Sequence, residues 1–234
     1  MTTTHTSGTR LFANEACDNF GEIGAIAPSS PSLARAMTLA LDRRRSPRAV
    51  LEVGAGTGAV TTSLMERLGP DDRLDVVESN DAFADALRVV TEASAPTTRP
   101  HTTVHTTRIE TFDTDVRYDA ILSGLPFTNA TPDQVASILD RYDALLADGG
   151  SVVYFAYVGT RRMRSVTASR SEARRHATVE RLLSEYRGRF DTSGQTVWRN
   201  LPPARVWTLQ SPQHTTSRSS SRSSSRSSSK EKQQ

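Results

Sequence analysis

A chain of 234 residues with a formal net charge of +3 is long enough for one medium-sized domain with a substantial buried core. Its single cysteine, Cys17, excludes an intrachain disulfide, and no apolar run approaches the roughly 20 residues that a membrane-spanning helix needs. These features exclude a disulfide-stapled secreted domain and an integral helical membrane protein, and they favour a cytoplasmic protein.

The two ends of the chain differ in composition from its middle. Residues 1–10 are Thr-rich and lack the order of a secretory signal, so we expect a disordered leader. Residues 11–20 show a weakly amphipathic pattern. Residues 211–234 repeat Ser-Ser-Ser-Arg units and are predicted to be a disordered tail. The folded domain is therefore expected within residues 11–210.

Strand and helix patterns alternate through the middle of the chain. After a helix with apolar residues from Leu33 to Ala40, which Ser30 or Ser32 caps, β-type and helical periodicities follow one another. Strands are predicted at 49–53, 73–77, 102–106, 118–123 and 151–157, and helices at 59–68, 81–92 and 132–146. This alternation predicts an α/β protein with a mostly parallel, doubly wound sheet.

The order changes near the end of the domain. Residues 196–199 and 205–209 read as two strands joined by Asn200-Leu201-Pro202-Pro203. So short a connection requires antiparallel pairing, because a parallel crossover needs a dozen or more residues. The sequence thus predicts a Rossmann-like sheet of seven strands, mostly parallel, that finishes in a C-terminal antiparallel hairpin.

Positive charge is concentrated in two late segments. Residues 161–190 contain nine arginines against three glutamates, and Val179, Leu183 and Tyr186 share one apolar face of a predicted basic helix. The tail contributes five more basic residues against Glu231. Such segments favour an anionic partner, a membrane surface or a nucleic acid.

A glycine-rich turn follows the first predicted strand of the sheet, in Glu52-Val53-Gly54-Ala55-Gly56-Thr57-Gly58. Glycines there let a ligand approach the backbone, and Glu78, at the end of the next strand, is placed to accept both hydroxyls of a ribose. The relaxed dinucleotide pattern also fits Gly54, Gly56 and Ala59. Glu52 favours a cationic ligand over a pyrophosphate, because its carboxylate lies beside the turn.

Residues 52–58 resemble motif I of class I S-adenosylmethionine-dependent methyltransferases, and Glu78 resembles their ribose-binding acid. The resemblance implies S-adenosyl-L-methionine as cofactor. The residues that it places around the donor are Glu52, Gly54, Gly56, Thr57, Gly58, Glu78, Ser79, Thr107, Ser123, Gly124 and Leu125. Relatives often carry an adenine-binding Asp after the third strand; here Thr107 or the backbone takes that place.

The segment Ser123-Gly124-Leu125-Pro126-Phe127 resembles the Asn-Leu-Pro-Tyr box of ribosomal RNA adenine dimethylases. In that box an Asn holds a flipped adenine and an aromatic ring stacks on it. Gly124 stands in place of the Asn, which speaks against a nucleobase as acceptor.

A second resemblance covers residues 12–209. Residues 23–30, the Ser-Gly-Leu-Pro segment, residues 155–157 and the ending Asn-Leu-Pro-Pro-Ala-Arg-Val-Trp at 200–207 together resemble bacterial phospholipid N-methyltransferases. These enzymes methylate phosphatidylethanolamine and bind the membrane peripherally. The resemblance implies a phospholipid acceptor, an anionic membrane surface as partner and a position at the inner face of the membrane.

Methyl transfer to an amine asks for a neutral nitrogen held in line with the donor. Tyr157 is the first candidate for a group that takes the proton, and Tyr154 is the second. Phe127 and Arg205 are the predicted substrate-binding residues, with Arg205 or an arginine from 161–175 on the lipid phosphate. No metal is expected, because His101 and His105 have no evident third ligand.

Three hypotheses remain open on the sequence alone. The first is a phospholipid N-methyltransferase, the second an RNA adenine or small-molecule methyltransferase, and the third a donor- or lipid-binding module without activity. The sequence does not predict an oligomeric state.

Overall fold

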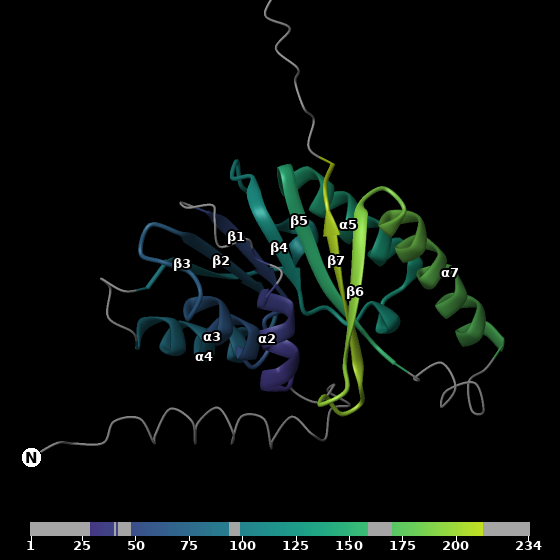
Figure 1. Ribbon diagram of the computed structural model, residues 1–234, viewed down its shortest axis with the longest axis horizontal. Helices are drawn as coiled ribbons and strands as arrows, with labels where there is room; N and C mark the ends of the chain where they lie inside the picture. The colour runs from purple at the N-terminus through teal and green to yellow at the C-terminus, as the bar shows by residue number, and fades with distance from the viewer. Residues whose placement is uncertain (1–28, 40, 42–47, 94–98, 159–169, 213–234) are drawn as a thin grey trace, which may run out of the picture.

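The computed structural model describes residues 29–39, 41, 48–93, 99–158 and 170–212 (Figure 1). The predicted leader, the amphipathic pattern at 11–20, the arginines at 161–164 and residues 213–234 of the tail lie outside the described residues.

One seven-stranded sheet forms the centre of the molecule. Its strands are β1 (Ala49–Val53), β2 (Arg73–Glu78), β3 (His101–Thr106), β4 (Tyr118–Ser123), β5 (Leu146–Tyr157), β6 (Asp191–Val197) and β7 (Ala204–Gln210). They lie in the order β3-β2-β1-β4-β5-β7-β6, and only β7 runs against the others. This sheet confirms the predicted Rossmann-like fold and its antiparallel hairpin, and it places β7 between β5 and β6.

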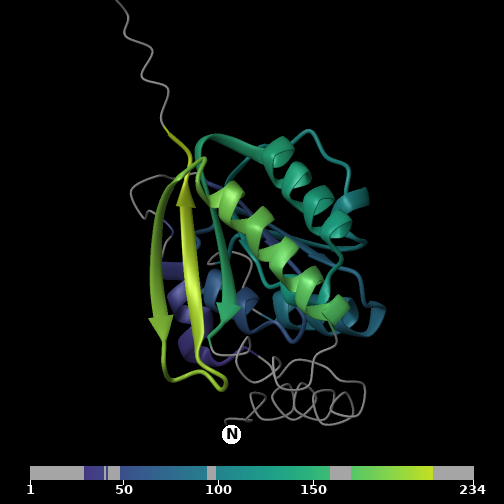
Figure 2. The same ribbon diagram turned by 90° about the vertical axis from the view of Figure 1, so that its right-hand side faces the viewer.

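Helices cover both faces of the sheet (Figures 1 and 2). The helices α2 (Pro31–Leu39), α3 (Ala59–Met65) and α4 (Asp81–Glu92) pack on one face, while α5 (Pro132–Leu145) and α7 (Arg170–Arg187) pack on the other. Two short 3-10 turns, η2 (Ile109–Thr111) and η3 (Phe127–Asn129), follow β3 and β4. The core therefore consists of two apolar layers, one on each side of the sheet.

Side-chain caps begin three of these helices. The Ser30 hydroxyl accepts a hydrogen bond from the Leu33 amide at 3.2 Å, so Ser30 is the cap of α2. Asn80 caps α4 in the same way, and Thr131 forms a capping box with Gln134 at the start of α5. The caps of α4 and α5 lie beside the loops that follow β2 and β4, and they hold those loops in place.

Two predicted boundaries differ from the structure. The helix α5 ends at Leu145 and β5 starts at once, because residues 147–150 form a bulge inside the strand and leave Gly149 at φ 68°. The last hairpin pairs Asp191–Val197 with Ala204–Gln210, so Trp198 and Arg199, predicted as strand, lie in the turn.

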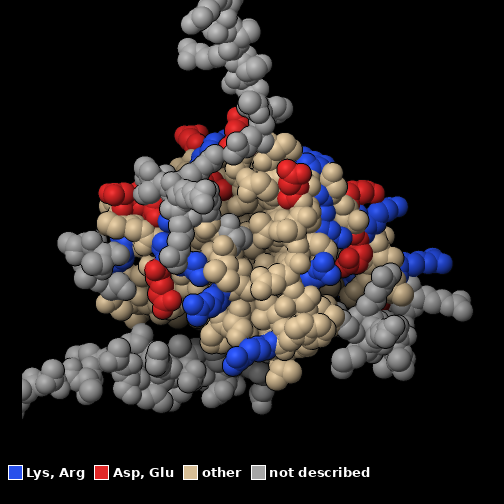
Figure 3. Space-filling model, in the orientation of Figure 1, with Lys and Arg blue, Asp and Glu red and all other residues tan. Residues whose placement is uncertain are grey.

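The basic helix α7 buries its predicted apolar face. Val179, Leu183 and Tyr186 are buried, and the Tyr186 hydroxyl donates to Asp143 of α5 at 3.0 Å. Basic side chains gather on the α7 side of the molecule, interspersed with acidic ones (Figure 3). Within the described part of the chain, no helix combines the length and the hydropathy needed to cross a bilayer.

Candidate active site

The glycine-rich turn between β1 and α3 forms the floor of the site. Gly54, Gly56 and Gly58 adopt φ values of 69°, 53° and 80°, in the region that L side chains rarely occupy. A Cβ added to Gly56 would meet no atom within 4 Å, so this glycine faces open space. The turn therefore offers a ligand bare backbone.

Glu78 closes the turn from the end of β2. One carboxylate oxygen accepts the Gly56 amide and the other accepts the Asn80 amide, each at 2.9 Å. The side chain is largely buried but lines the cavity. Backbone donors thus hold this carboxylate at the position that the sequence assigned to a ribose-binding acid.

Glu52 lies deeper, on β1 just before the turn. It is 2% exposed, and neither of its carboxylate oxygens finds a hydrogen-bond partner among the described residues. Burial raises the pKa of this carboxyl group to about 8; the nearby hydroxyl and amide of Thr61, outside hydrogen-bond geometry, offset only part of that rise, and Glu78 adds to it. A buried acid without a partner is costly for the free protein, and a cationic ligand at this point would remove the cost.

The loop after β4 comes very close to the glycine turn. A Cβ on Gly124 would lie 2.4 Å from the Gly54 carbonyl oxygen, so no side chain fits there. The structure thus gives a packing reason for glycine where adenine dimethylases have Asn. Ser123 is fully buried and its hydroxyl hydrogen-bonds that of Tyr142 at 2.8 Å, while Leu125 reaches the cavity.

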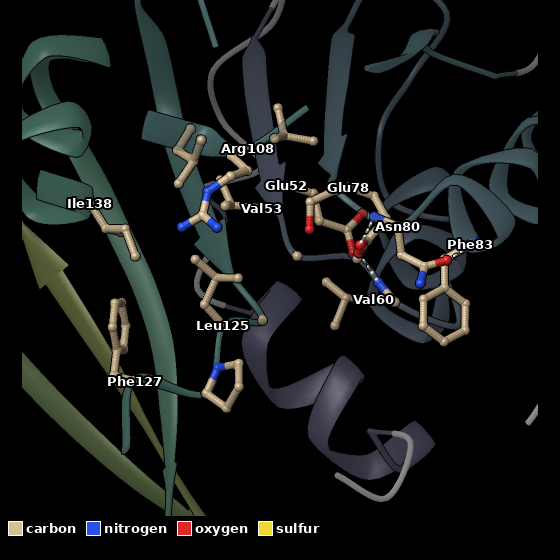
Figure 4. Close-up of a pocket in the computed structure, with 18 of the residues that line it drawn as sticks. Glu52, Val53, Val60, Glu78, Asn80, Phe83, Arg108, Leu125, Phe127 and Ile138 are labelled. Carbon is tan, nitrogen blue, oxygen red and sulfur yellow. Dashed lines mark hydrogen bonds between the residues drawn. The ribbon is translucent and has the colours of Figure 1, made fainter. Parts of the chain in front are cut away.

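A cavity of about 520 Å³ opens above the turn, at the carboxyl ends of the parallel strands. Figure 4 shows Glu52, Glu78 and Asn80 on one side of it and Leu125, Phe127 and Ile138 on the other. The predicted site residues that line it are Glu52, Gly54, Gly56, Thr57, Glu78, Ser79, Thr107, Gly124, Leu125, Phe127 and Tyr157. An acidic half and an apolar half therefore meet in one cavity.

Four predicted site residues are not among those that line it. Gly58 begins α3 and Ser123 points toward Tyr142, so both shape the site from outside. Tyr154 is 2% exposed, and its hydroxyl accepts a hydrogen bond from Arg187 at 2.5 Å. Arg205 stacks on the Trp207 ring at 4.4 Å.

Strand alternation explains why Tyr154 and Arg205 do not line the cavity while Tyr157 does. Tyr154 and Trp207 pair across β5 and β7 and face α7, whereas Phe155 and Tyr157 face the opposite side of the sheet. Tyr157 therefore reaches the cavity, and its pKa is raised by burial, so the hydroxyl stays protonated at neutral pH. It can donate a hydrogen bond there but is a poor proton acceptor.

Sequence reasoning missed several lining residues. Arg108 and Glu110 follow β3 and form an ion pair at 2.6 Å, and Arg108 extends into the middle of the cavity (Figure 4). Arg108 is the only basic residue among the described residues that line the cavity. The missed lining residues also include Ser29, Asn80, Phe83, Asn129 and Gln134. Except for Ser29, which precedes α2, their position after β2, β3 and β4 was the available signal.

The charges of the cavity fit S-adenosylmethionine better than a dinucleotide. Three acidic side chains, of Glu52, Glu78 and Glu110, line it against the single guanidinium of Arg108, and a cation beside Glu52 would favour the ionised form of that group. A pyrophosphate would be repelled by such a site, whereas a ligand with a sulfonium and an ammonium group would be attracted. Glu78 would hold the ribose, and the glycine turn would contact the amino-acid portion of the donor. Glu52, just before the turn, is the acid left without a hydrogen-bond partner among the described residues.

Comparison with known proteins finds similarity to methyltransferases. Residues 50–150 match the family described as "Methyltransferase domain". Together with the sheet order and the glycine turn, this match shows a region similar to a methyltransferase domain with a Rossmann-like fold, and the charges of the cavity fit S-adenosylmethionine as the methyl donor.

The individual relatives are more distant. Ornithine lipid N-methyltransferase of Singulisphaera acidiphila is 41% identical over 66 residues, which cover 28% of this chain and only about a third (34%) of that protein. The O-methyltransferase of Bacillus cereus in complex with SAH has a TM-score of 0.61 at 15% identity, with 88% of this chain and 91% of that chain covered. The N-methyltransferase NodS of Bradyrhizobium japonicum with S-adenosyl-l-homocysteine has a TM-score of 0.55 at 18% identity, covering 88% and 100%.

Proposed function

We propose that this protein transfers methyl groups from S-adenosylmethionine to the amine of a zwitterionic membrane lipid of the phosphatidylethanolamine type, at the surface of the membrane. The observation that carries the proposal is the division of the cavity. Its acidic half suits the cationic donor, and its other half combines an apolar wall with the single cation Arg108. The short match to an ornithine lipid N-methyltransferase supports a lipid acceptor.

The apolar half suits the reaction because methyl transfer needs a neutral amine and little competing water. S-adenosylmethionine, when bound, supplies an electrophilic methyl group. Leu125, Phe127 and Ile138 form a wall that would exclude water from the amine and favour its uncharged form. Phe127 is 4% exposed and makes an edge contact with Tyr154, with 5.6 Å between ring centroids, so the wall is packed against the core.

Arg108 provides the counterpart for the anionic group of the headgroup. Amine lipids carry a phosphate or a carboxylate a few bonds from the amine, and a guanidinium binds either in a forked geometry. The Arg108 side chain is 59% exposed and bonds only one carboxylate oxygen, that of Glu110, at 2.6 Å. Donors remain available on it, and Arg108 replaces Arg205 as the proposed anion-binding residue, because Arg205 stacks on Trp207 and is not among the residues that line the cavity.

A methyl-transfer assay tests the proposal. Labelled S-adenosylmethionine is incubated with vesicles containing phosphatidylethanolamine, with vesicles containing ornithine lipid, and with total RNA. We expect label in at least one lipid and none in RNA. Label in RNA alone would overturn the lipid assignment, and donor binding without label in any fraction would overturn the assignment of enzyme activity.

A matched pair of arginine variants tests the anion-binding role. Arg108→Gln should raise the apparent KM for the lipid about tenfold or more, since a charged hydrogen bond contributes about 1.5–3 kcal/mol, and leave donor affinity nearly unchanged. Arg88→Gln is the control, because Arg88 also pairs with an acid, Asp85, but does not line the cavity. Equal effects of the two variants would contradict the role of Arg108.

A further inference from the structure

The tip of the β6–β7 hairpin exposes large apolar side chains. Trp198 is 73% exposed and Leu201 is 85% exposed, the two highest values among the large hydrophobic residues that the structure describes as exposed. Both lie within the six residues that join the strands. An exposed Trp and Leu so close together is costly in water, so this tip is a candidate contact surface.

The exposure belongs to an ordered turn. Asn200, between the two apolar residues, is 3% exposed; its amide group donates to the Pro202 carbonyl at 2.7 Å, and its carbonyl oxygen accepts the Ser30 amide at 3.2 Å. The Val158 amide donates to the Pro203 carbonyl at 2.6 Å. With its polar groups bonded inward, the turn holds Trp198 and Leu201 outward.

The same bonds place the tip at the mouth of the cavity. Ser29, next to Ser30, lines the cavity, and so does Tyr157, next to Val158. β6 runs in the same direction as β1 and β4, so the turn that follows it lies at the same edge of the sheet as the donor site (Figures 1 and 2). A surface that docks on this tip would also face the cavity.

The chemistry of the tip fits a lipid bilayer. Trp favours the level of the headgroups, Leu favours the acyl region, and the exposed Arg199 between them complements anionic headgroups. Residues 198–203 contain no acidic residue. Tan and blue side chains dominate the lower centre of Figure 3, at the end of the molecule where the hairpin tip lies.

We infer that the turn from Trp198 to Pro203 is the surface by which this protein docks on a lipid bilayer and brings its cavity mouth to the acceptor headgroups. This inference rests on the proposed function, because it assumes that the acceptor is a lipid. It assigns the contact to an ordered hairpin, separate from the arginine-rich segments that the sequence pointed to.

The fluorescence of Trp198 reports directly on contact between the hairpin tip and lipid. Vesicles of phosphatidylcholine and phosphatidylglycerol, without phosphatidylethanolamine and without donor, are titrated into the full chain. We expect Trp emission to shift to shorter wavelength and to be quenched by brominated lipid acyl chains. Both changes should disappear in Trp198→Ala, which retains the partly buried Trp207. Emission that vesicles leave unchanged, as when another part of the chain or a second copy covers the tip, would overturn the inference.

Vesicle affinity gives the second readout. The double variant Trp198→Ala/Leu201→Ala should bind the same vesicles about tenfold or more weakly, because it removes most of the apolar area of the tip. Val89→Ala is the matched control, since Val89 is 60% exposed on α4, away from the hairpin, and we expect it to bind like the wild type. Equal binding by the double variant and the wild type would also overturn the inference.

Methyl transfer separates this inference from the proposed function. The double variant should lose about tenfold in rate on phosphatidylethanolamine in vesicles and little on a short-chain phosphatidylethanolamine dissolved as monomers, because only the first acceptor requires docking. If the wild type methylates no lipid yet docks through Trp198, the proposed function fails and the docking surface stands. If the wild type methylates lipid while the double variant binds vesicles as tightly as the wild type, only the docking surface fails.

Discussion

Two carboxylates are buried in neighbouring strands of the sheet, and their surroundings are opposite. Asp75 of β2 is fully buried and accepts hydrogen bonds from Arg73 at 2.6 Å, His105 at 2.8 Å and Tyr118 at 2.9 Å. Glu52 of β1 is 2% exposed and has no hydrogen-bond partner among the described residues. One acid is satisfied by the fold, and the other is left for a ligand.

The pKa values of the two groups follow this difference. Burial alone would raise the pKa of Asp75, but the bonds from Arg73, His105 and Tyr118 hold it below the ordinary value. For Glu52 burial prevails and raises the pKa to about 8. The comparison teaches that burial of an acid marks a binding site only where the fold leaves that acid unpaired.

The largest effect is expected from Asp75. Asp75→Asn should lower the free energy of unfolding by about 3 kcal/mol at pH 7, because Arg73 loses its charged partner and the bonds from His105 and Tyr118 are weakened. The stabilisation by Asp75 is present above the ordinary pKa of 3.8 and is lost as the pH falls through its lower folded value, so the two proteins should converge in acid. Urea unfolding of both proteins at pH 7 and in acid measures the loss of stability and the convergence.

The control for this prediction is Asp85→Asn. Asp85 is 76% exposed and pairs with Arg88 on the surface of α4, so its replacement should change stability by less than about 0.5 kcal/mol. Donor affinity of the folded Asp75→Asn protein should match the wild type. A large loss of donor affinity with stability intact would reverse the roles assigned to the two acids.

Glu52→Gln should change stability in the opposite direction. Between pH 4.5 and about 8 the folded state keeps a proton on Glu52 that the unfolded state has lost, so the cost of burying this acid grows through that window. Removing the acid should stabilise the free protein by about 2 kcal/mol at pH 8 and by less at pH 5. It should also weaken donor binding about thirtyfold, because a charged contact with the ligand is lost.

Thermal unfolding at the two pH values, combined with calorimetric titration of the donor, measures this exchange of stability for affinity. Destabilisation by Glu52→Gln at pH 8 would show that the carboxylate already has a partner in the free protein.

A smaller effect should appear in the pH dependence of donor affinity. Binding of a cation beside Glu52 favours its ionised form, so binding should release a proton below pH 8. Affinity should then rise with pH by up to about tenfold per unit between pH 5.5 and 7, where the ammonium group of the donor stays charged. Calorimetric titrations in buffers of different ionisation enthalpy measure the number of protons released on binding. A donor affinity that does not change with pH, or a pH dependence that Glu52→Gln retains, would contradict the assignment of the released proton to Glu52.

The smallest effect is expected at Tyr157, a half-buried ionisable group at the cavity. Its pKa is raised by burial, so the hydroxyl stays protonated at neutral pH and we expect it to be a poor base there. Tyr157→Phe should therefore reduce kcat by no more than about threefold, far below the roughly 100-fold loss typical of removing a general base. A kcat loss of that larger size, with KM unchanged, would restore Tyr157 as a catalytic residue.

Much of the donor site could be read from local patterns. The turn at 54–58 and the acid at 78 are predictable because strand ends, positive-φ glycines and a distal carboxylate have short-range sequence signatures. The strands and helices followed from periodicity for the same reason. Glu52 could be named as a site residue from its place beside the turn, although its lack of partners could not.

Tertiary packing decided the remainder. Arg108 enters the cavity, Arg205 stacks on Trp207 outside the cavity lining, and Gly124 touches the Gly54 carbonyl because of how separate strands pair and cross, which no local pattern records. Asn200 meets Ser30 across 170 residues of chain, and this contact places the exposed hairpin tip at the cavity mouth. Local backbone preferences thus determined the elements and the donor turn, while long-range contacts determined which side chains share the cavity.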